Sequence, residues 1–224
     1  MDAKSIRTSS KVRLGIVAAG ACAAALALFA WEPTSSAQIK SPGAHPDYSV
    51  EVDPHLVLGL ADHPWGSSTN GWGAGARISI PIVEQGPIRT INNSMAIGFG
   101  ADWVHFSDTC WGYWYHGAPV NYPYATQDCT ANTLWFPVVL QWNFWLTKVV
   151  SVFGEPGLSI VHRSWDWWWA SPACQYGWCK TTQSTTDLEP FVFFAGARFL
   201  FSQSAGLTIR LGWPYASVGA SLLF

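Results

Sequence analysis

Apolar and polar residues alternate along most of the chain after residue 48, and this two-residue period predicts β-strands whose faces meet different surroundings. The final strand shows the pattern most plainly. Apolar side chains occupy every second position from Ala216 to Phe224, small or polar ones stand between them, and only Leu223 breaks the alternation. The chain therefore ends on a strand with one continuous apolar face.

The same alternation predicts eight strands, each with an apolar face opposite a face that is richer in small, polar or charged residues. They are predicted at residues 49–60, 71–82, 94–103, 133–144, 150–163, 191–201, 207–213 and 215–224. Backbone groups inside a lipid bilayer must all be hydrogen-bonded, so strands that cross it have to close on themselves. Eight is the smallest number in the series of transmembrane barrels. We therefore predict an all-β fold, an eight-stranded antiparallel up-and-down transmembrane β-barrel.

The composition supports a membrane protein built of strands. Hydrophobic residues make up 49% of the chain and charged residues only 12%, whereas an average soluble protein has about 25% charged residues. The 12 Lys and Arg residues are outnumbered by 14 Asp and Glu, for a net charge of −2. This balance argues against nucleic acid as a partner.

The first 37 residues have the layout of a secretory signal peptide. Basic residues between Lys4 and Arg13 precede an uncharged apolar run, Leu14–Ala30, and the small residues Ser-Ser-Ala follow before Gln38. We expect cleavage before Gln38. An uncleaved anchor is the rival interpretation, although the run is at the short end for a transmembrane helix. A lipoprotein modified at Cys22 is disfavoured, since the apolar run continues past that cysteine.

The connections between the predicted strands alternate in length, with long ones after the first, third and fifth strands and short ones after the second, fourth and sixth. Together with the strand number, the signal peptide and the terminal Phe224, this asymmetry resembles the small eight-stranded outer-membrane barrels of the OmpA/OmpX type. The resemblance implies a protein of the Gram-negative outer membrane, surrounded by its lipid. The short turns would face the periplasm, the long loops would face outward, and Phe224 would serve as a signal to the barrel assembly machinery.

The predicted organisation is then a signal peptide over residues 1–37, a periplasmic lead over residues 38–48 and the barrel over residues 49–224. We expect no peptidoglycan-binding domain after the barrel. We expect neither a cofactor nor a metal.

Charged residues fall on the inward positions of the predicted strands. They are Glu51, Asp53, Arg77, Asp102, Glu155, Arg163, Arg198 and Arg210. An eight-stranded barrel is just wide enough for its own side chains to fill it, and buried charges have to be paired. The favoured interpretation is a plug of ion pairs that makes the barrel solid. The alternative is a narrow polar pore.

Two long connections contain pairs of cysteines, Cys110 with Cys129 and Cys174 with Cys179. A secreted protein keeps disulfides, and pairing within each connection requires no contact between the two connections. Four cysteines allow three pairings, of which we favour this one. A zinc site is the alternative, although Cys174 and Cys179 have no matching pair of Cys or His nearby.

Aromatic residues gather where the predicted strands leave the membrane. The loop positions are Trp111, Trp114, Tyr115, Trp167, Trp168 and Trp169, and Trp142, Phe144 and Trp145 lie near a short turn. Amphipathic rings favour the headgroup region, so an aromatic girdle is one interpretation. Exposed tryptophan and tyrosine also bind partners. The loop rings are therefore candidates for a surface glycan or protein ligand.

One group of residues could be catalytic. His162 and Ser164 share a face of the fifth strand, and the alternation places Glu189 of the sixth strand on the same outward face. The trio resembles the lipid A deacylases of the outer membrane, and the resemblance implies ester hydrolysis with a His base, a Ser nucleophile and an orienting Glu. Here Trp165 follows the serine where that family has Asn. We therefore favour a structural or surface-binding barrel, with the enzyme and the pore as alternatives.

The cysteine pattern makes a direct prediction. Peptide mapping of the protein without reduction should recover two crosslinks, 110–129 and 174–179. Each loop closure should stabilise the fold by about 2–4 kcal/mol in the chain-entropy view. Free thiols at all four positions in protein taken from the cell envelope would contradict it.

Overall fold

The computed structural model of the protein describes residues 38–60, 70–111, 126–170 and 178–224. The predicted signal peptide lies outside the described residues. A short 3-10 helix, η1 (Gln38–Lys40), precedes the strands. The strands are β1 (Glu51–Gly59), β2 (Gly71–Val83), β3 (Asn93–Trp111), β4 (Thr126–Trp145), β5 (Val150–Ala170), β6 (Trp178–Leu200), β7 (Ala205–Trp213) and β8 (Tyr215–Leu223). No helix within the described ranges is long and apolar enough to cross a membrane.

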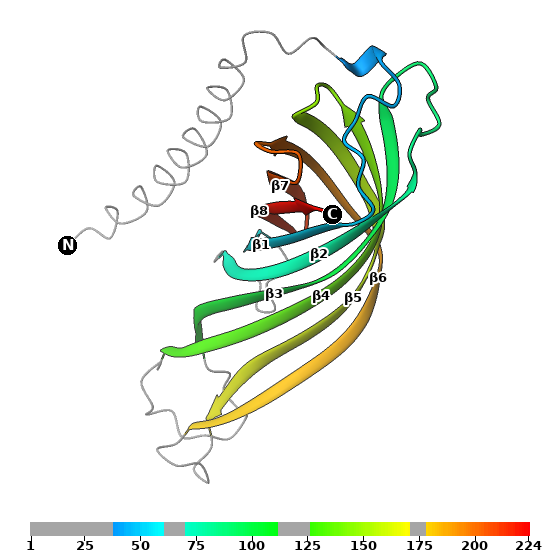
Figure 1. Cartoon of the computed structure of the whole chain (residues 1–224). Helices are drawn as coiled ribbons and strands as arrows, with labels where there is room; N and C mark the ends of the chain where they lie inside the picture. Colours follow the sequence, from blue (N-terminus) through cyan, green and yellow to red (C-terminus); the bar gives the residue numbers. More distant parts are fainter. Residues whose placement is uncertain (1–37, 61–69, 112–125, 171–177) are drawn as a thin grey trace, which may run out of the picture. The chain divides into compact units, whose positions relative to one another are not determined.

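The eight strands form one closed barrel in which each strand is paired with the next in chain order (Figure 1). Every neighbouring pair is antiparallel, and β1 closes the circle by pairing with β8. The prediction of an all-β, eight-stranded antiparallel barrel is confirmed. Because every strand has two neighbours, the barrel leaves no open sheet edge in its closed part.

The predicted alternation of faces is confirmed along the closed part of the barrel. On β1 the odd positions Glu51, Asp53, His55 and Val57 are buried, while the intervening side chains from Pro54 onward are exposed. The terminal strand follows the same rule. Leu223, which interrupts its apolar alternation, points inward and is only 4% exposed. The two-residue period therefore separates a buried interior from an exposed apolar exterior.

Four strands are longer than their sequence pattern predicted. β3 and β4 pair as far as Trp111 and Thr126, and β5 and β6 pair as far as Ala170 and Trp178. By contrast, β7 pairs with β6 only between Phe193 and Leu200. Figure 1 shows β3 to β6 continuing beyond the other four strands as a sheet of their own, which we call the extension. The prediction of a loop after the fifth strand was wrong at residues 164–170 and 178–190, which belong to β5 and β6. On β6 polar residues occupy both faces there and leave no alternation to detect.

A bulge lies at the base of the extension. Ser159 of β5 is opposite Glu189 of β6, whereas Gly157 is opposite Val192, so β6 has one residue more than β5 between these pairs. An extra residue reverses which side chains face inward. Phe191, within the bulge, and Phe193, below it, are exposed on the outside, and beyond the bulge the outward positions are the even ones such as Leu188.

The other end of the barrel is closed by the segment before β1. The N–H of Asn92, in the turn after β2, donates to the carbonyl of Ile39 over 2.7 Å. The ring of His45 stacks on Trp145 with centroids 6.0 Å apart. Tyr48 packs against a buried cluster of Trp145, Leu200 and Leu223. Trp145 is fully buried, so its assignment to a surface girdle was wrong, since it follows Asn143 on the inward face of β4.

Burial also perturbs the acid–base chemistry at this end. It raises the pKa of the Tyr48 phenol above its ordinary value, against the lowering effect of the neighbouring Arg198 cation. The phenol therefore stays protonated and neutral where it packs.

Two glycines of β5 provide a matched test of the packing. A Cβ on Gly157 would lie 2.2 Å from the carbonyl oxygen of Val138, whereas the nearest atom to a Cβ on Gly154 is 3.9 Å away in the Phe193 ring. Gly157→Ala should destabilise the barrel by about 1–3 kcal/mol through overpacking. Gly154→Ala should change stability by less than about 1 kcal/mol. Urea unfolding followed by tryptophan fluorescence measures both, and equal midpoints for the two variants would contradict the packing described.

Candidate functional site

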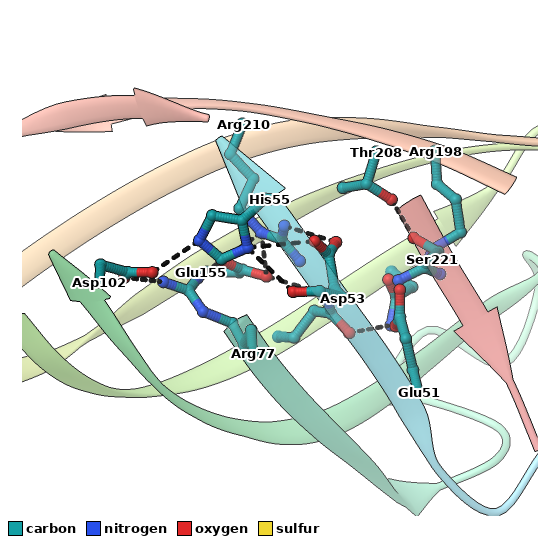
Figure 2. Close-up of polar contacts among 12 residues, drawn as sticks. Glu51, Asp53, His55, Arg77, Asp102, Glu155, Arg198, Thr208, Arg210 and Ser221 are labelled. Atoms are coloured by element: carbon teal, nitrogen blue, oxygen red, sulfur yellow. Dashed lines mark hydrogen bonds and ion pairs between the residues drawn. The ribbon is translucent and has the colours of Figure 1, made fainter. Parts of the chain in front are cut away.

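A histidine held between two carboxylates lies at the centre of the barrel interior (Figure 2). Nε2 of His55 is 2.6 Å from Oδ1 of Asp102, and Nδ1 is 3.1 Å from Oδ1 of Asp53. All three side chains are buried. An ionised carboxylate accepts hydrogen bonds and cannot donate them. Both contacts are therefore satisfied only when His55 has a proton on each ring nitrogen.

Two arginines from different strands, Arg77 of β2 and Arg210 of β7, share the carboxylate of Glu155. Nη1 of Arg77 donates to Oε2 of Glu155 over 2.5 Å, and Nε of Arg210 lies 3.3 Å from both oxygens of that carboxylate. Arg210 also donates through Nη1 to Oδ2 of Asp53 over 2.7 Å. Gln141 donates to Glu155 over 2.8 Å. The glutamate therefore joins β2, β4, β5 and β7 through one buried side chain.

These groups form a single compensated network. Its cations are Arg77, Arg210 and the doubly protonated His55, and its anions are Asp53, Asp102 and Glu155. The positive and negative charges are equal in number. Each cation has at least two polar contacts within the network. Burying charges is expensive unless they are paired and hydrogen-bonded. Every charge of this network is paired, although Nε of Arg77 and Nη2 of Arg210 have no hydrogen-bond partner among the described residues.

Tyr215 of β8 completes the network at the end of the interior nearer the extension. Its hydroxyl donates to Oδ2 of Asp102 and accepts from Nη2 of Arg77, the latter over 3.1 Å. A separate ion pair of Arg198 and Glu51 lies on the side toward the turns, and its guanidinium carbon is 5.7 Å from the centre of the Trp145 ring. Figure 2 shows Thr208 and Ser221 in contact beside this pair.

Apolar side chains cover both ends of the charged interior. At the end nearer the extension, one buried cluster contains Val104, Phe106, Trp135 and Phe194, and Tyr215 joins it to the network. On the turn side the cluster around Trp145 covers the Arg198 pair. The ion pairs therefore lie between two apolar layers, as expected for a barrel that is filled by its own side chains.

The structure places seven of the eight predicted interior charges inside the barrel and one at its outer rim. Arg163 is in contact with the extension and not with the network. Its Nη2 donates to Glu189 over 2.8 Å and its Nη1 to Asp187 over 3.3 Å, and its guanidinium carbon lies 5.5 Å from the centre of the Trp135 ring. The prediction that Arg163 is matched by an interior carboxylate was wrong, because the strand continues past the closed part of the barrel at this position.

The proposed catalytic trio is not brought together. Nδ1 of His162 lies 2.8 Å from the hydroxyl of Thr186, which is its partner on β6. Glu189 bonds instead to Arg163 on the opposite face of the sheet. The bulge between Glu189 and Val192 is the reason, because it reverses the alternation from which the shared face was predicted. Among the residues that the structure describes, no carboxylate contacts His162, so this geometry lacks the third member of a triad.

Some predicted positions can be described only in part. Cys129 and Cys179 are each disulfide-bonded, while the side chains of Cys110 and Cys174 lie outside the described residues, so the pairing stays a prediction. The loop aromatics also fall outside what is described: residues 114 and 115 entirely, and 111 and 167–169 in their side chains. No cluster of His, Cys, Asp and Glu that could hold a metal occurs in the described part of the chain.

Phe224 lies just past the end of β8, with its side chain 68% exposed. Its carbonyl oxygen accepts hydrogen bonds from the N–H groups of Ser49 and Val50 over 2.6 and 3.1 Å, and its own N–H donates to the carbonyl of Val50. The terminal residue therefore belongs to the seam where β8 meets β1.

Two residues of the network were missed at the level of sequence, although the signal was present. His55 shares its face with Asp53, and Tyr215 stands on the polar side of the terminal strand. Both would have been found by including every titratable side chain at inward positions, and not only the residues with a full charge.

Comparison with known proteins adds a likeness in fold. No family model matches the chain, and no curated protein does. Among solved structures, the chain is similar to Ail, the attachment invasion locus protein of Yersinia pestis, both alone and in complex with the heparin analogue sucrose octasulfate. Each match has a TM-score of 0.42 and 12% identity, and covers 79% of this chain and 97% of the other. The assignment of a closed eight-stranded barrel rests on the strand pairings of the chain itself.

Two glutamate-to-glutamine changes test the buried network with the same chemistry at two depths. Glu155→Gln leaves Arg77 and Arg210 without their shared anion and should lower the free energy of unfolding by about 3–5 kcal/mol. Glu189→Gln weakens a partly buried, solvent-accessible pair with Arg163 and should cost less than about 1 kcal/mol. Urea unfolding at neutral pH measures both. Similar losses of unfolding free energy in the two variants would contradict the idea that the buried network stabilises the barrel more than the pair of Arg163 and Glu189 does.

Proposed function

We propose that the protein is an integral outer-membrane barrel with a sealed interior, which holds the extension at the cell surface for binding. The observation that carries the proposal is the contrast between the two surfaces of the closed barrel. Charged side chains fill the inside, and large apolar side chains face outward on all the strands. Examples are Leu56, Ile80, Phe99, Val138, Leu158, Phe193, Leu211 and Val218.

Such an exterior fits lipid better than water. Apolar patches on soluble monomers are small, whereas a transmembrane barrel has an apolar band around its whole circumference. Several outward residues are more than 60% exposed, among them Leu56, Phe191 and Leu211. A hydrocarbon surrounding would remove this surface from water at no cost in unpaired backbone groups, because the strands are closed.

The orientation follows from the lengths of the connections. The segment before β1 and the short turns after β2, β4 and β6 lie at one end, and the extension lies at the other. In barrels of this kind the short turns face the periplasm, so the extension would face the medium. This placement implies two partners, the lipid of the outer membrane and the assembly machinery that reads Phe224. The loops at the extension would be tied by disulfides that pair Cys110 with Cys129 and Cys174 with Cys179.

The filled interior supports an anchor over a pore. The network of Arg77, Arg210, His55 and their carboxylates is buried between two apolar layers, and water or ions would have to break ion pairs to pass. The enzyme alternative has no support from geometry, because Glu189 does not reach His162. Binding at the surface is therefore the function that the arrangement favours.

Gel migration and conductance together test the proposal. Protein purified in detergent should migrate differently before and after boiling, because a closed barrel resists the detergent until it is heated. In planar bilayers the same preparation should give no sustained single-channel currents, and Ser164→Ala should leave both properties unchanged. A protein recovered as a soluble monomer without detergent would contradict the membrane location. Steady ion currents from wild type would contradict the sealed interior.

A further inference from the structure

The turn between β2 and β3 forms a small ordered structure at the end of the barrel away from the extension. It spans residues 84–92, whereas the two other turns at this end span only 146–149 and 201–204. Nδ2 of Asn93 donates to the carbonyl oxygens of Ile88 and Ile91 over 2.7 and 2.9 Å. The N–H of Gly86 donates to the carbonyl of Asn93 over 2.8 Å. One asparagine therefore holds the turn in a defined shape.

The same asparagine ties the turn to the outward face of the barrel. Oδ1 of Asn93 accepts a hydrogen bond from Nε1 of Trp142 on β4 over 3.1 Å. The indole of Trp142 packs against Phe144, with ring centroids 4.8 Å apart, and both side chains occupy outward positions of β4. Amphipathic rings of this kind are typical of the boundary between membrane and water. The turn therefore begins where the apolar exterior of the barrel ends.

An open hollow of about 570 Å³ lies between this turn and the adjoining strands. The residues that line it are Val83, Gln85, Gly86, Pro87, Arg89 and Met95. Val83 and Met95 are opposite each other in the register of β2 and β3, and the side chain of Val83 is exposed. The hollow thus combines apolar walls from the two strands with a guanidinium and an amide from the turn.

Arg89 brings an uncompensated positive charge to this hollow. Within the described ranges no ion pair involves Arg89, and none of the residues that line the hollow is acidic. A site with one cation, one amide donor and apolar walls is complementary to an anion that is joined to an apolar group.

A second hollow at the same end offers a natural contrast. It has a volume of about 630 Å³ and is lined by residues 44–47, 148–149 and 200–203. Its cation is Lys148, but Asp47 also lines it. A carboxylate in the lining would repel an anion, so the charge of the second hollow favours anionic ligands less than the charge of the first.

We propose that the hollow beside Arg89 binds the phosphodiester headgroup of a glycerophospholipid in the leaflet on the periplasmic side. A guanidinium can donate to two phosphate oxygens at once, and the Gln85 amide adds a further donor. The walls formed by Val83 and Met95 would contact the glycerol and the first carbons of the acyl chains. Basic pockets at a membrane boundary recognise anionic headgroups by the same chemistry. The inference rests on the proposed membrane location and orientation, and it names one lipid that the barrel holds.

Native mass spectrometry of the protein purified from membranes in detergent, with added phosphatidylglycerol, tests the site. Wild type should retain one phosphatidylglycerol molecule in a saturable manner, and Arg89→Gln should weaken this retention by about tenfold or more. Lys148→Gln removes the same charge at the same end of the barrel and should retain the lipid as wild type does. Equal retention by wild type and Arg89→Gln would overturn the proposal. Equal losses in the two variants would replace a site at Arg89 with general attraction between charges.

Two further probes identify the part of the lipid that is recognised. Diacylglycerol with the same acyl chains lacks the phosphate and should bind at least about tenfold more weakly. Glycerol 1-phosphate lacks the acyl chains and should not displace the lipid at equal concentration. Diacylglycerol binding as tight as that of phosphatidylglycerol would refute recognition of the phosphate. Displacement by glycerol 1-phosphate would refute a lipid site in favour of a site for free phosphate esters.

The headgroup site and the membrane barrel can fail separately. The heat-dependent gel shift shows whether each variant has a folded barrel. Protein that shows this shift but retains no lipid through its phosphate would refute the headgroup site and leave the membrane barrel intact. Protein that is soluble without detergent would refute the membrane barrel, and with it the placement on which the headgroup site depends.

Discussion

The constraint on which the rest of this structure depends is that charges buried inside a narrow barrel must be compensated by other charges in the same space. Glu155 bonds to Arg77 and Arg210, and Arg210 bonds in turn to Asp53. These contacts cross the interior and connect strands that are not neighbours in the sheet. Removing one member leaves a charge without a partner in a place that water does not reach. The interior therefore favours one closed arrangement of the strands over alternatives with a shifted register.

A filled interior also decides where a function can reside. In the described part of the closed barrel, ion pairs and two apolar layers of side chains occupy the interior. Its outward surface is apolar and suits a lipid environment. Polar chemistry that faces water is concentrated in the extension, where both faces and one edge of β6 are accessible. Under the proposed function, the barrel would anchor the protein and the extension would contact partners.

The sequence predicted the closed barrel well because its two faces differ so strongly. Alternation of the kind seen from Ala216 to Phe224 is imposed by an apolar outside and a crowded inside, and it located all eight strands. The same test failed in the extension, where β6 is exposed on both faces, for example at Ser184 and Thr185, and its polar residues show no two-residue period. It also placed Glu189 on the wrong face of the sheet, because the bulge adds one residue to β6 and the sequence alternation gives no sign of it. Contacts between non-neighbouring strands, such as that between Arg210 and Asp53, could be anticipated as a class but not as pairs.

The state of His55 is the most direct measure of charge compensation, because the network has equal numbers of cations and anions only if this imidazole is charged. Both of its ring nitrogens face carboxylate oxygens, at 2.6 Å from Asp102 and 3.1 Å from Asp53. Nitrogen-15 NMR of detergent-solubilised protein labelled at histidine, with His55→Gln to assign the signals, would report the proton on each nitrogen. The account predicts that both nitrogens of His55 carry a proton at neutral pH. A neutral ring with one unprotonated nitrogen would contradict it.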